Sequence, residues 1–278
     1  MARGISLHVG LNRVDPLAYG GWEGDLVAAE ADARDMEELA RRQDFETLLL
    51  LSPAATRDAV LENIRNAAEE LQPGDFFLLT YAGHGGRLPD IGGDESDLRD
   101  ETWCLYDGQL VDDELGSLWY QFRRGVRVLA ISDSCHSGTV TRGTPSGYGR
   151  RGESEDSMFV ESAPRYRFMP DAVAARAFRA NRELYLGIAE SLVEGSPEPK
   201  ASVRLLAGCQ DDQFASDGPF NGLFTGVLKR VWGEGDFEGD YGEFFHQLCR
   251  RMPRSQRPNH VLLGEPDRGF DRQRPFEI

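Results

Sequence analysis

The chain has 278 residues, enough for one large α/β domain with a substantial core or for two small domains. Its 47 acidic residues outnumber its 31 basic ones, and the formal net charge of −16 disfavours binding to nucleic acid or to an anionic membrane. No apolar run approaches the roughly 18 residues of a membrane span. The N-terminus carries no signal stretch and the four cysteines have no CxxC spacing, so we expect reduced thiols and a cytoplasmic protein.

The first half of the chain alternates short apolar runs with segments of helical periodicity. Strands are expected at 5–11, 45–51, 75–81 and 126–131, helices at 26–42, 56–71 and 112–122, and a small hairpin at 101–111. The 75–81 run is too uniformly apolar to have a wet face, which is typical of a parallel sheet covered on both sides. We therefore predict an α/β fold with a single, mostly parallel central sheet of about six strands and helices on both faces.

The alternation lapses in the second half. Residues 139–170 are rich in Arg, Gly, Ser and Glu, and their composition predicts an exposed, mobile loop insertion. Helices are expected again at 171–192, 220–232 and 241–252, and strands at 203–207 and 261–263. Neither a repeat nor a domain boundary is evident, so we expect a single domain over residues 1–278.

Two segments place a reactive side chain directly after a predicted buried strand. His84 follows the 75–81 strand within Tyr-Ala-Gly-His-Gly-Gly, and Cys135 follows the 126–131 strand within Asp-Ser-Cys-His-Ser-Gly. A thiol with an ordinary pKa of about 8.5 becomes an effective nucleophile at neutral pH when a base is adjacent. We therefore predict that Cys135 is a nucleophile and His84 its base, with the backbone amides of Gly85 and Cys135 binding the oxyanion.

Simpler interpretations exist for each residue alone. A lone buried cysteine is most often structural, and a histidine in a glycine turn is usually only a turn residue. His136 is a rival base, but side chains adjacent in sequence rarely face one another across a site. The presence of both groups at strand ends favours catalysis.

The chain at this point resembles the caspase-fold cysteine peptidases of clan CD, family C14, and among them the metacaspases and bacterial orthocaspases. The resemblance runs from residue 5 to about residue 265 and rests on the two motifs above, on Leu-Val-Ala-Ala-Glu-Ala-Asp-Ala at 26–33 and on Ala-Gly-Cys-Gln-Asp-Asp-Gln-Phe-Ala-Ser-Asp at 207–217. Caspases carry their histidine about 50 residues before the cysteine, as here. The caspase motif Gln-Ala-Cys-x-Gly is absent, whereas Asp-Ser-Cys-His-Ser-Gly is the metacaspase form. The resemblance implies a caspase-like fold, a cysteine endopeptidase and a monomer.

The resemblance also implies an acidic pocket for the substrate residue that precedes the cut. The matching positions are Asp32 and Asp133, whose carboxylates would pair with a substrate Arg, or with Lys, and repel an Asp. Ser216 and Asp217 match a further segment that borders the substrate cleft. The alternative for Asp32 is a solvated carboxylate on a helix surface.

Acidic residues crowd the region 90–113. Calcium-dependent metacaspases use acidic residues that match Asp100, Asp112 and Asp113, but Arg142 stands where their remaining ligand falls. We therefore expect that no cofactor is required, and Ca²⁺ binding remains an alternative to a solvated acidic loop.

Arginines in the loop after the cysteine are candidate processing sites, because proteolytic nicking concentrates in exposed, mobile segments. The sites are Arg142, Arg150 and Arg151, with Arg165 and Arg167 in the same weakly anchored stretch. The chain itself or an upstream activating protease would cut there; the alternative is an inert surface insertion. Two other functions stay open: a different clan CD specificity, as in gingipain-like or legumain-like enzymes, and a catalytically idle caspase-fold adaptor.

Overall fold

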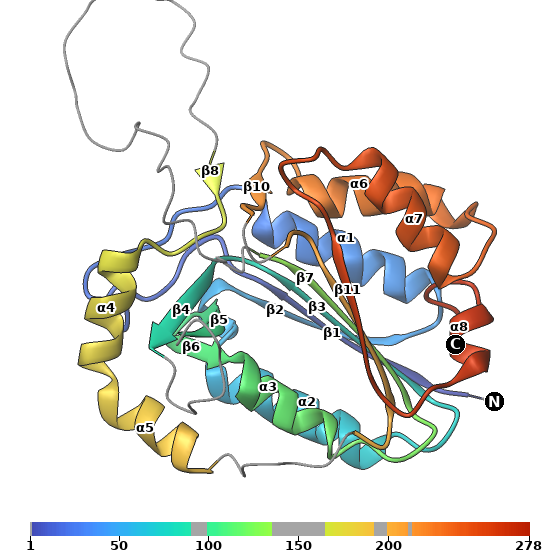
Figure 1. The fold of residues 1–278 in the computed structure, drawn as a ribbon, viewed down its shortest axis with the longest axis horizontal. Coiled ribbons are helices and arrows are strands. Elements are labelled where there is room, and N and C mark those ends of the chain that lie inside the picture. The colour runs from blue at the N-terminus through green and yellow to red at the C-terminus, as the bar shows by residue number, and fades with distance from the viewer. Residues whose placement is uncertain (1, 90–98, 135–164, 192–198, 211–212) are drawn as a thin grey trace, which may run out of the picture.

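The computed structural model describes residues 2–89, 99–134, 165–191, 199–210 and 213–278. Its centre is a six-stranded sheet with the strand order β11-β9-β7-β3-β1-β2 (Figure 1). These strands are β1 (Gly4–Gly10), β2 (Glu46–Leu51), β3 (Phe76–Ala82), β7 (Arg127–Asp133), β9 (Ser202–Ala207) and β11 (Asn259–Gly264). Every neighbouring pair is parallel except β11 with β9. The predicted mostly parallel sheet is therefore confirmed.

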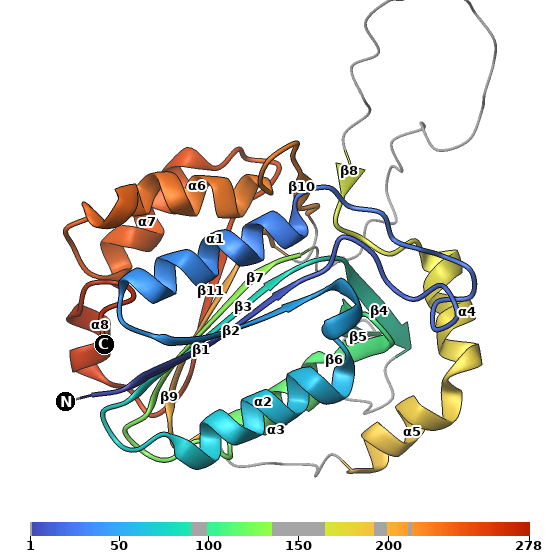
Figure 2. The same cartoon turned by 180° about the vertical axis from the view of Figure 1, so that it is seen from behind.

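Helices cover both faces of this sheet, as predicted (Figures 1 and 2). One face carries α1 (Ala29–Arg42), α6 (Leu223–Trp232), α7 (Tyr241–Arg251) and the short α8 (Arg268–Arg272), and the other carries α2 (Arg57–Glu70) and α3 (Asp112–Trp119). Short 3₁₀ helices span Ser52–Ala54 and Gly233–Gly235. None of the helices in the described ranges is long and apolar enough to cross a bilayer.

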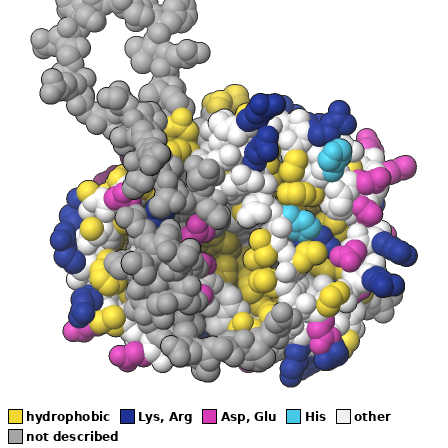
Figure 3. All heavy atoms as spheres, viewed as in Figure 1, with side chains coloured by type: hydrophobic (Ala, Val, Ile, Leu, Met, Phe, Trp, Pro, Cys, Tyr) yellow, Lys and Arg dark blue, Asp and Glu magenta, His cyan; other side chains and the backbone are white. Residues whose placement is uncertain are grey.

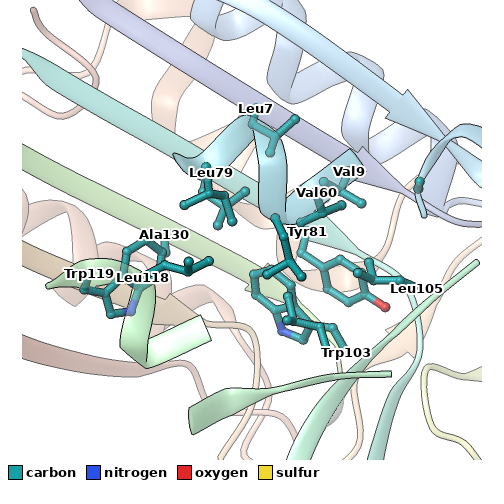
Figure 4. Close-up of a cluster of buried hydrophobic side chains, with 14 of the residues drawn as sticks. Leu7, Val9, Val60, Leu79, Tyr81, Trp103, Leu105, Leu118, Trp119 and Ala130 are labelled. Atoms are coloured by element: carbon teal, nitrogen blue, oxygen red, sulfur yellow. The ribbon is translucent and has the colours of Figure 1, made fainter. Parts of the chain in front are cut away.

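Strand β3 is uniformly apolar because its two faces enter two different cores. Phe77, Leu79 and Tyr81 pack in the core beneath α2 and α3, whereas Phe76 and Leu78 pack against the opposite helix layer. Figure 4 shows Leu79 and Tyr81 among the buried side chains of the first core. Truncation of a residue such as Leu79 to alanine should cost about 2–5 kcal/mol of unfolding free energy.

Smaller elements surround the C-terminal edge of the main sheet. A three-stranded antiparallel sheet contains β4 (Gly85–Pro89), β5 (Arg99–Leu105) and β6 (Gly108–Val111), and it includes the hairpin expected at 101–111. A two-stranded ladder joins β8 (Arg165–Tyr166) to β10 (Ser216–Asp217). Sequence periodicity predicted neither β4 nor this ladder, because both are too short to show a pattern.

Two segments differ from their predictions. The single helix expected at 171–192 is two helices, α4 (Asp171–Ala180) and α5 (Arg182–Ser191). The break falls at Asn181, whose side-chain amide donates hydrogen bonds to the carbonyl groups of Ala177 and Ala18, both at 3.0 Å. The loop predicted to be exposed as far as residue 170 differs at its end, because Arg167 and Met169 are fully buried.

Candidate active site

His84 lies at the C-terminal edge of the main sheet, between β3 and β4, in a turn held by Tyr81. The Tyr81 hydroxyl donates a hydrogen bond to the His84 carbonyl at 2.7 Å, while its ring stacks on Trp103 with centroids 4.4 Å apart. A Cβ atom at Gly83 would come within 2.6 Å of that hydroxyl, so the turn requires glycine there. The histidine backbone is thus fixed by the core rather than by the loop alone.

The His84 ring is oriented by a backbone carbonyl. Its Nε2 atom lies 3.0 Å from the carbonyl oxygen of Gly24, and the Trp22 ring packs on it with centroids 4.7 Å apart. Since a carbonyl only accepts hydrogen bonds, Nε2 carries the proton of the neutral ring and Nδ1 keeps its lone pair. Nδ1 is buried and makes no hydrogen bond within the described residues. Nδ1 is therefore the ring atom that is left able to accept a proton.

Burial lowers the pKa of His84 to about 4. Desolvation of the charged ring is the largest cause, the Gly24 carbonyl opposes it, and the positive charge of Arg167 adds to the lowering. The ring is consequently neutral at pH 7, the form that can accept a proton from a thiol.

The strand that precedes the second predicted catalytic residue, Cys135, is the neighbour of β3 in the sheet. Strand β7 pairs with β3 so that Asp133 lies opposite Ala82, and the chain continues to the buried Ser134. The Ser134 carbonyl accepts a hydrogen bond from the Cys209 thiol at 3.3 Å. The chain thus reaches the residue before Cys135 beside the strand that leads to His84. Cys135, with its amide, the rival base His136 and the processing candidates Arg142, Arg150 and Arg151 lie outside the described residues.

Three of the predicted pocket residues meet next to this edge. Asp32 comes from α1, Asp133 from the end of β7 and Asp217 from β10, and their side chains are at most 2% exposed. Each carboxylate is held by hydrogen bonds from neighbouring groups. The donors are Asn221 Nδ2 to Asp32 at 2.8 Å, the amide and hydroxyl of Thr225 to Asp133 at 3.0 and 2.7 Å, and the Val27 amide to Asp217 at 2.8 Å. Ser216 follows in β10, where its amide donates to Gln256 at 3.0 Å.

The guanidinium group of Arg167 fills the space between these carboxylates. Its Nη1 lies 3.1 Å from Asp133 Oδ2 and donates to the Asp133 carbonyl at 3.0 Å. Its Nη2 donates to Asp217 Oδ1 at 3.1 Å and to Asp32. The expectation that Arg167 lies in a weakly anchored loop is wrong, because three buried ion pairs fix its side chain. The composition of the loop gave no indication of these ion pairs. In a sequence, an arginine that pairs with distant carboxylates cannot be distinguished from an arginine exposed to solvent.

The pocket holds more negative than positive charge. Desolvation is the largest cause that raises the pKa of Asp32 to about 6, the charge of Asp133 adds to it, and Arg167 opposes it. Burial by itself would lower the pKa of Arg167, but the three carboxylates outweigh burial and raise it. The pocket is therefore built for a cation, and a buried anion would be strongly disfavoured there.

The backbone amide of Gly85, a predicted oxyanion donor, also faces Arg167. It donates a hydrogen bond to the Arg167 carbonyl oxygen at 3.0 Å. An amide that binds a carbonyl oxygen in this way can bind the oxyanion formed when that carbonyl is attacked.

The predicted calcium residues belong to other elements, Asp100 to β5 and Asp112 and Asp113 to the first turn of α3. Among residues in the described ranges, no group of three or more His, Cys, Asp or Glu side chains is arranged to hold a metal ion. The Asp112 residue as a whole is exposed, whereas its carboxyl group is desolvated. This desolvation is the largest cause that raises the pKa of Asp112 to about 8, and the charges of Asp113 and Glu101 add to it. The acidic residues at 90, 94, 95 and 97 lie outside the described residues.

A separate apolar hollow of about 400 Å³ opens on the face seen in Figure 3. Its lining includes Trp119 from α3, Leu205 from β9 and Val261 from β11. Among the described residues, neither His84 nor any of the three pocket carboxylates lines it.

The chain is similar to known proteins in both sequence and structure. The sequence model of the caspase domain matches residues 14–266. Metacaspase-1 of Schizosaccharomyces pombe is 31% identical over 196 residues, which cover 64% of this chain and 46% of that protein. Metacaspase-1A of Aspergillus clavatus is 28% identical over 250 residues, which cover 81% of this chain and 56% of that protein. The chain thus spans about half the length of these curated relatives. The crystal structure of Geobacter sulfurreducens protein GSU0716 superposes with a TM-score of 0.88 at 48% identity, over 99% of each chain.

Proposed function

Because the chain belongs to the caspase-domain peptidase family, we propose that it is a cysteine endopeptidase that cleaves after arginine and, less efficiently, after lysine. The observation that supports this specificity best is the guanidinium group bound by three carboxylates beside His84. In this proposal Cys135 is the nucleophile and no cofactor is required.

The proposed reaction begins with proton transfer from the Cys135 thiol to Nδ1 of His84, while the Gly24 carbonyl holds Nε2–H. The thiolate attacks the substrate carbonyl carbon, and the amides of Gly85 and Cys135 stabilise the oxyanion. Nδ1–H of His84 then protonates the leaving amine. Water, deprotonated by the same imidazole, hydrolyses the thioester and regenerates the thiol.

The pocket geometry favours arginine over lysine. Nη1 of the bound guanidinium contacts Asp133, whereas Nη2 contacts Asp32 and Asp217. A lysine ammonium is a single point charge and cannot contact carboxylates from these different elements in the same way. Loss of one such interaction is worth about 1.4 kcal/mol or more, so we expect at least a tenfold preference for arginine. A substrate aspartate would meet three like charges and should not be cleaved.

A peptide panel tests this proposal. Fluorogenic peptides that differ only in Arg, Lys, Asn or Asp before the cut are incubated with wild type, Cys135→Ala and Cys249→Ala, with Ca²⁺ and with a chelator. We expect the order Arg, Lys, then no detectable cleavage of Asn or Asp, complete loss in Cys135→Ala and full activity in Cys249→Ala. Preference for Asn would favour the legumain-like alternative, and preference for Asp would refute the assignment of the acidic pocket. Loss of activity in chelator that Ca²⁺ restores would overturn the absence of a metal requirement.

A thiol probe separates the enzyme from the idle adaptor. Cys104 and Cys209 are buried, Cys249 is half-buried, and burial raises the pKa values of Cys104 and Cys249. Iodoacetamide at neutral pH should therefore label Cys135 first. Equal, slow labelling of Cys135 and Cys249, in protein with no peptidase activity, would support the adaptor.

We also propose that the protease acts as a monomer on protein or peptide substrates and is regulated by clipping after the catalytic cysteine, by itself or by an upstream protease. Support for clipping comes from the arginines at positions 142, 150, 151 and 165, which suit the specificity proposed for the enzyme. Intact mass and size-exclusion chromatography of wild type and Cys135→Ala test both statements. Full activity in an unclipped wild-type chain would remove the regulatory role.

A further inference from the structure

Gly222 forms part of the wall of the acidic pocket, at the start of α6. Its amide donates hydrogen bonds to both carboxylate oxygens of Asp32, at 3.1 and 3.0 Å. Thr225, in the first turn of the same helix, donates from its amide and its hydroxyl to Oδ2 of Asp133. The start of α6 therefore holds two of the three carboxylates in place.

The guanidinium group in the pocket occupies the space beside Gly222 that a side chain would need. A Cβ atom at this position would lie 2.7 Å from both Cζ and Nη1 of Arg167 and 2.6 Å from Oδ2 of Asp133. Non-bonded carbon atoms pack best at about 3.5–4.0 Å, so these separations are too short. Any residue other than glycine would therefore have to displace the guanidinium group or the carboxylate.

The backbone at position 222 does not itself require glycine. Its φ of −57° and ψ of 152° lie in a region that ordinary L-residues adopt. Gly24, beside His84, differs in this respect, because its φ of +61° belongs to the left-handed region that favours glycine. The missing side chain at position 222 thus provides space in the pocket and does not serve the path of the chain.

Of the two groups that a methyl group would meet, the carboxylate is the more firmly held. Oδ2 of Asp133 accepts both hydrogen bonds from Thr225, at 3.0 and 2.7 Å, and Asp133 is fully buried. The guanidinium group is instead the far end of a flexible side chain. A methyl group at position 222 would therefore displace the cation, and first of all Nη1, the nitrogen that contacts Asp133.

We propose that Gly222 is a specificity-determining residue: the space beside it admits the planar guanidinium group, and a methyl group there shifts the preference from arginine towards lysine. This inference rests on the proposed function and names the residue that sets the choice between the two cations. A guanidinium group is a rigid fork, so Nη1 cannot withdraw without moving Nη2 from Asp32 and Asp217. A lysine ends in one ammonium nitrogen, which can rotate away from the methyl group and still reach these two carboxylates.

Peptide kinetics in processed enzyme test this proposal. Peptides that differ only in Arg or Lys before the cut are compared for wild type, Gly222→Ala and the matched control Gly226→Ala. Position 226 lies in the same helix, but a Cβ atom there would make only ordinary contacts, the nearest at 3.5 Å to Asn221. The ratio of kcat/KM for Arg over Lys should fall about tenfold or more in Gly222→Ala, through loss on the arginine peptide, and should equal that of wild type in Gly226→Ala.

Binding of side-chain analogues tests the pocket without peptidase activity. Arg167→Ala removes the resident guanidinium group and, with it, the clash that would destabilise Gly222→Ala. NMR titrations of Arg167→Ala and of the double variant with Gly222→Ala use propylguanidine and butylamine, the side chains of arginine and lysine. The added methyl group should weaken the binding of propylguanidine about tenfold or more, and that of butylamine less. Circular dichroism checks the folding of each variant.

Three outcomes would overturn the role of Gly222. They are an unchanged ratio for arginine over lysine in Gly222→Ala, an equal loss for both cations, and an equal fall of the ratio in Gly226→Ala. Hydrolysis of neither peptide by wild type would instead reject the proposed function. In that case the two analogues would still decide whether Gly222 selects between a guanidinium and an ammonium group.

Discussion

The Nε2 atom of His84 lies 3.0 Å from the carbonyl oxygen of Gly24, a residue of the loop between β1 and α1. This contact assigns the proton of the neutral ring to Nε2 and directs the Nδ1 lone pair at the site. It gives His84 a backbone partner in place of the side-chain carboxylate found in many catalytic triads.

We predict that His84 in uncut Cys135→Ala protein titrates near pH 4 rather than near its ordinary 6.5, because desolvation disfavours the charged ring. NMR of histidine-labelled protein, with His84→Asn for assignment, should show an unprotonated Nδ1 and a protonated Nε2 at pH 6. A midpoint near 6.5, or a proton on Nδ1, would contradict the assigned geometry. Opening of the site by Arg167→Ala should raise the midpoint, because it removes a positive charge and part of the burial.

Substitution of Tyr81 by Phe should lower kcat about three- to thirtyfold and leave KM within twofold. The hydroxyl that fixes the His84 carbonyl is lost, while the ring can still stack on Trp103. The unfolding free energy should fall by about 1–2 kcal/mol. Steady-state kinetics and urea unfolding measure the two effects.

Tyr241→Phe is the matched control for that substitution. Its hydroxyl is also buried and accepts a hydrogen bond from the Phe276 amide at 3.2 Å, but it lies in the core on the other side of the sheet. It should lose similar stability with no change in kcat. Equal loss of kcat in both variants would mean that Tyr81 acts only through stability.

The affinity for arginine substrates should weaken as the pH falls towards about 6. The pKa of Asp32 is raised to about 6 while the Arg167 guanidinium, which opposes the rise, is bound beside it. In a pocket without a bound guanidinium this opposing charge is missing, so the carboxylate takes up its proton at a higher pH and must release it to pair with the substrate. KM for an arginine peptide should therefore rise as the pH falls from about 8 to about 6 in processed enzyme. Asp32→Asn should raise KM at least tenfold at pH 7.5 and remove the pH dependence, whereas Asp58→Asn on the exposed surface of α2 should change neither. A flat KM profile in wild type would show that Asp32 stays ionised.

His8 should make the fold sensitive to acid. Its ring is buried beneath the sheet between the hydroxyls of Thr80 and Ser6, at 2.8 and 2.9 Å, and desolvation lowers its pKa to about 3. Between pH 6.5 and pH 3 the unfolded chain therefore binds a proton that the folded chain does not, so stability falls as the pH falls. The slope is on the order of 1.4 kcal/mol per pH unit for one such group.

Urea unfolding at pH 7, 5 and 4 measures that slope. His8→Gln should reduce it and leave peptidase activity at pH 7.5 unchanged, since the residue lies away from the site. His84→Asn should also reduce the slope but abolish activity. An unchanged slope in His8→Gln would mean that the buried ring takes up its proton in the folded state.

Much of the architecture follows from local pattern. The uniform apolar character of β3 requires burial on both faces, and the periodicity of 26–42 and 56–71 predicts the helices that provide it. Since parallel strands end at the same edge, the sequence also predicts that His84 and Cys135 meet there. The structure shows that the strands before them, β3 and β7, are parallel neighbours, while Cys135 itself lies outside the described residues. These properties depend on spacing over a few residues, which a sequence displays directly.

Other features depended on contacts between distant segments. The Gly24 carbonyl has no side chain to mark it, Asn181 breaks a helix by reaching back to Ala18, and Arg167 meets carboxylates from three separate elements. The chain on its own therefore determined the sheet, its helical layers and the edge where reactive groups gather. Only the tertiary structure decided which carbonyl orients the histidine and which arginine occupies the acidic pocket, because these pairings form when segments far apart in sequence close on one another.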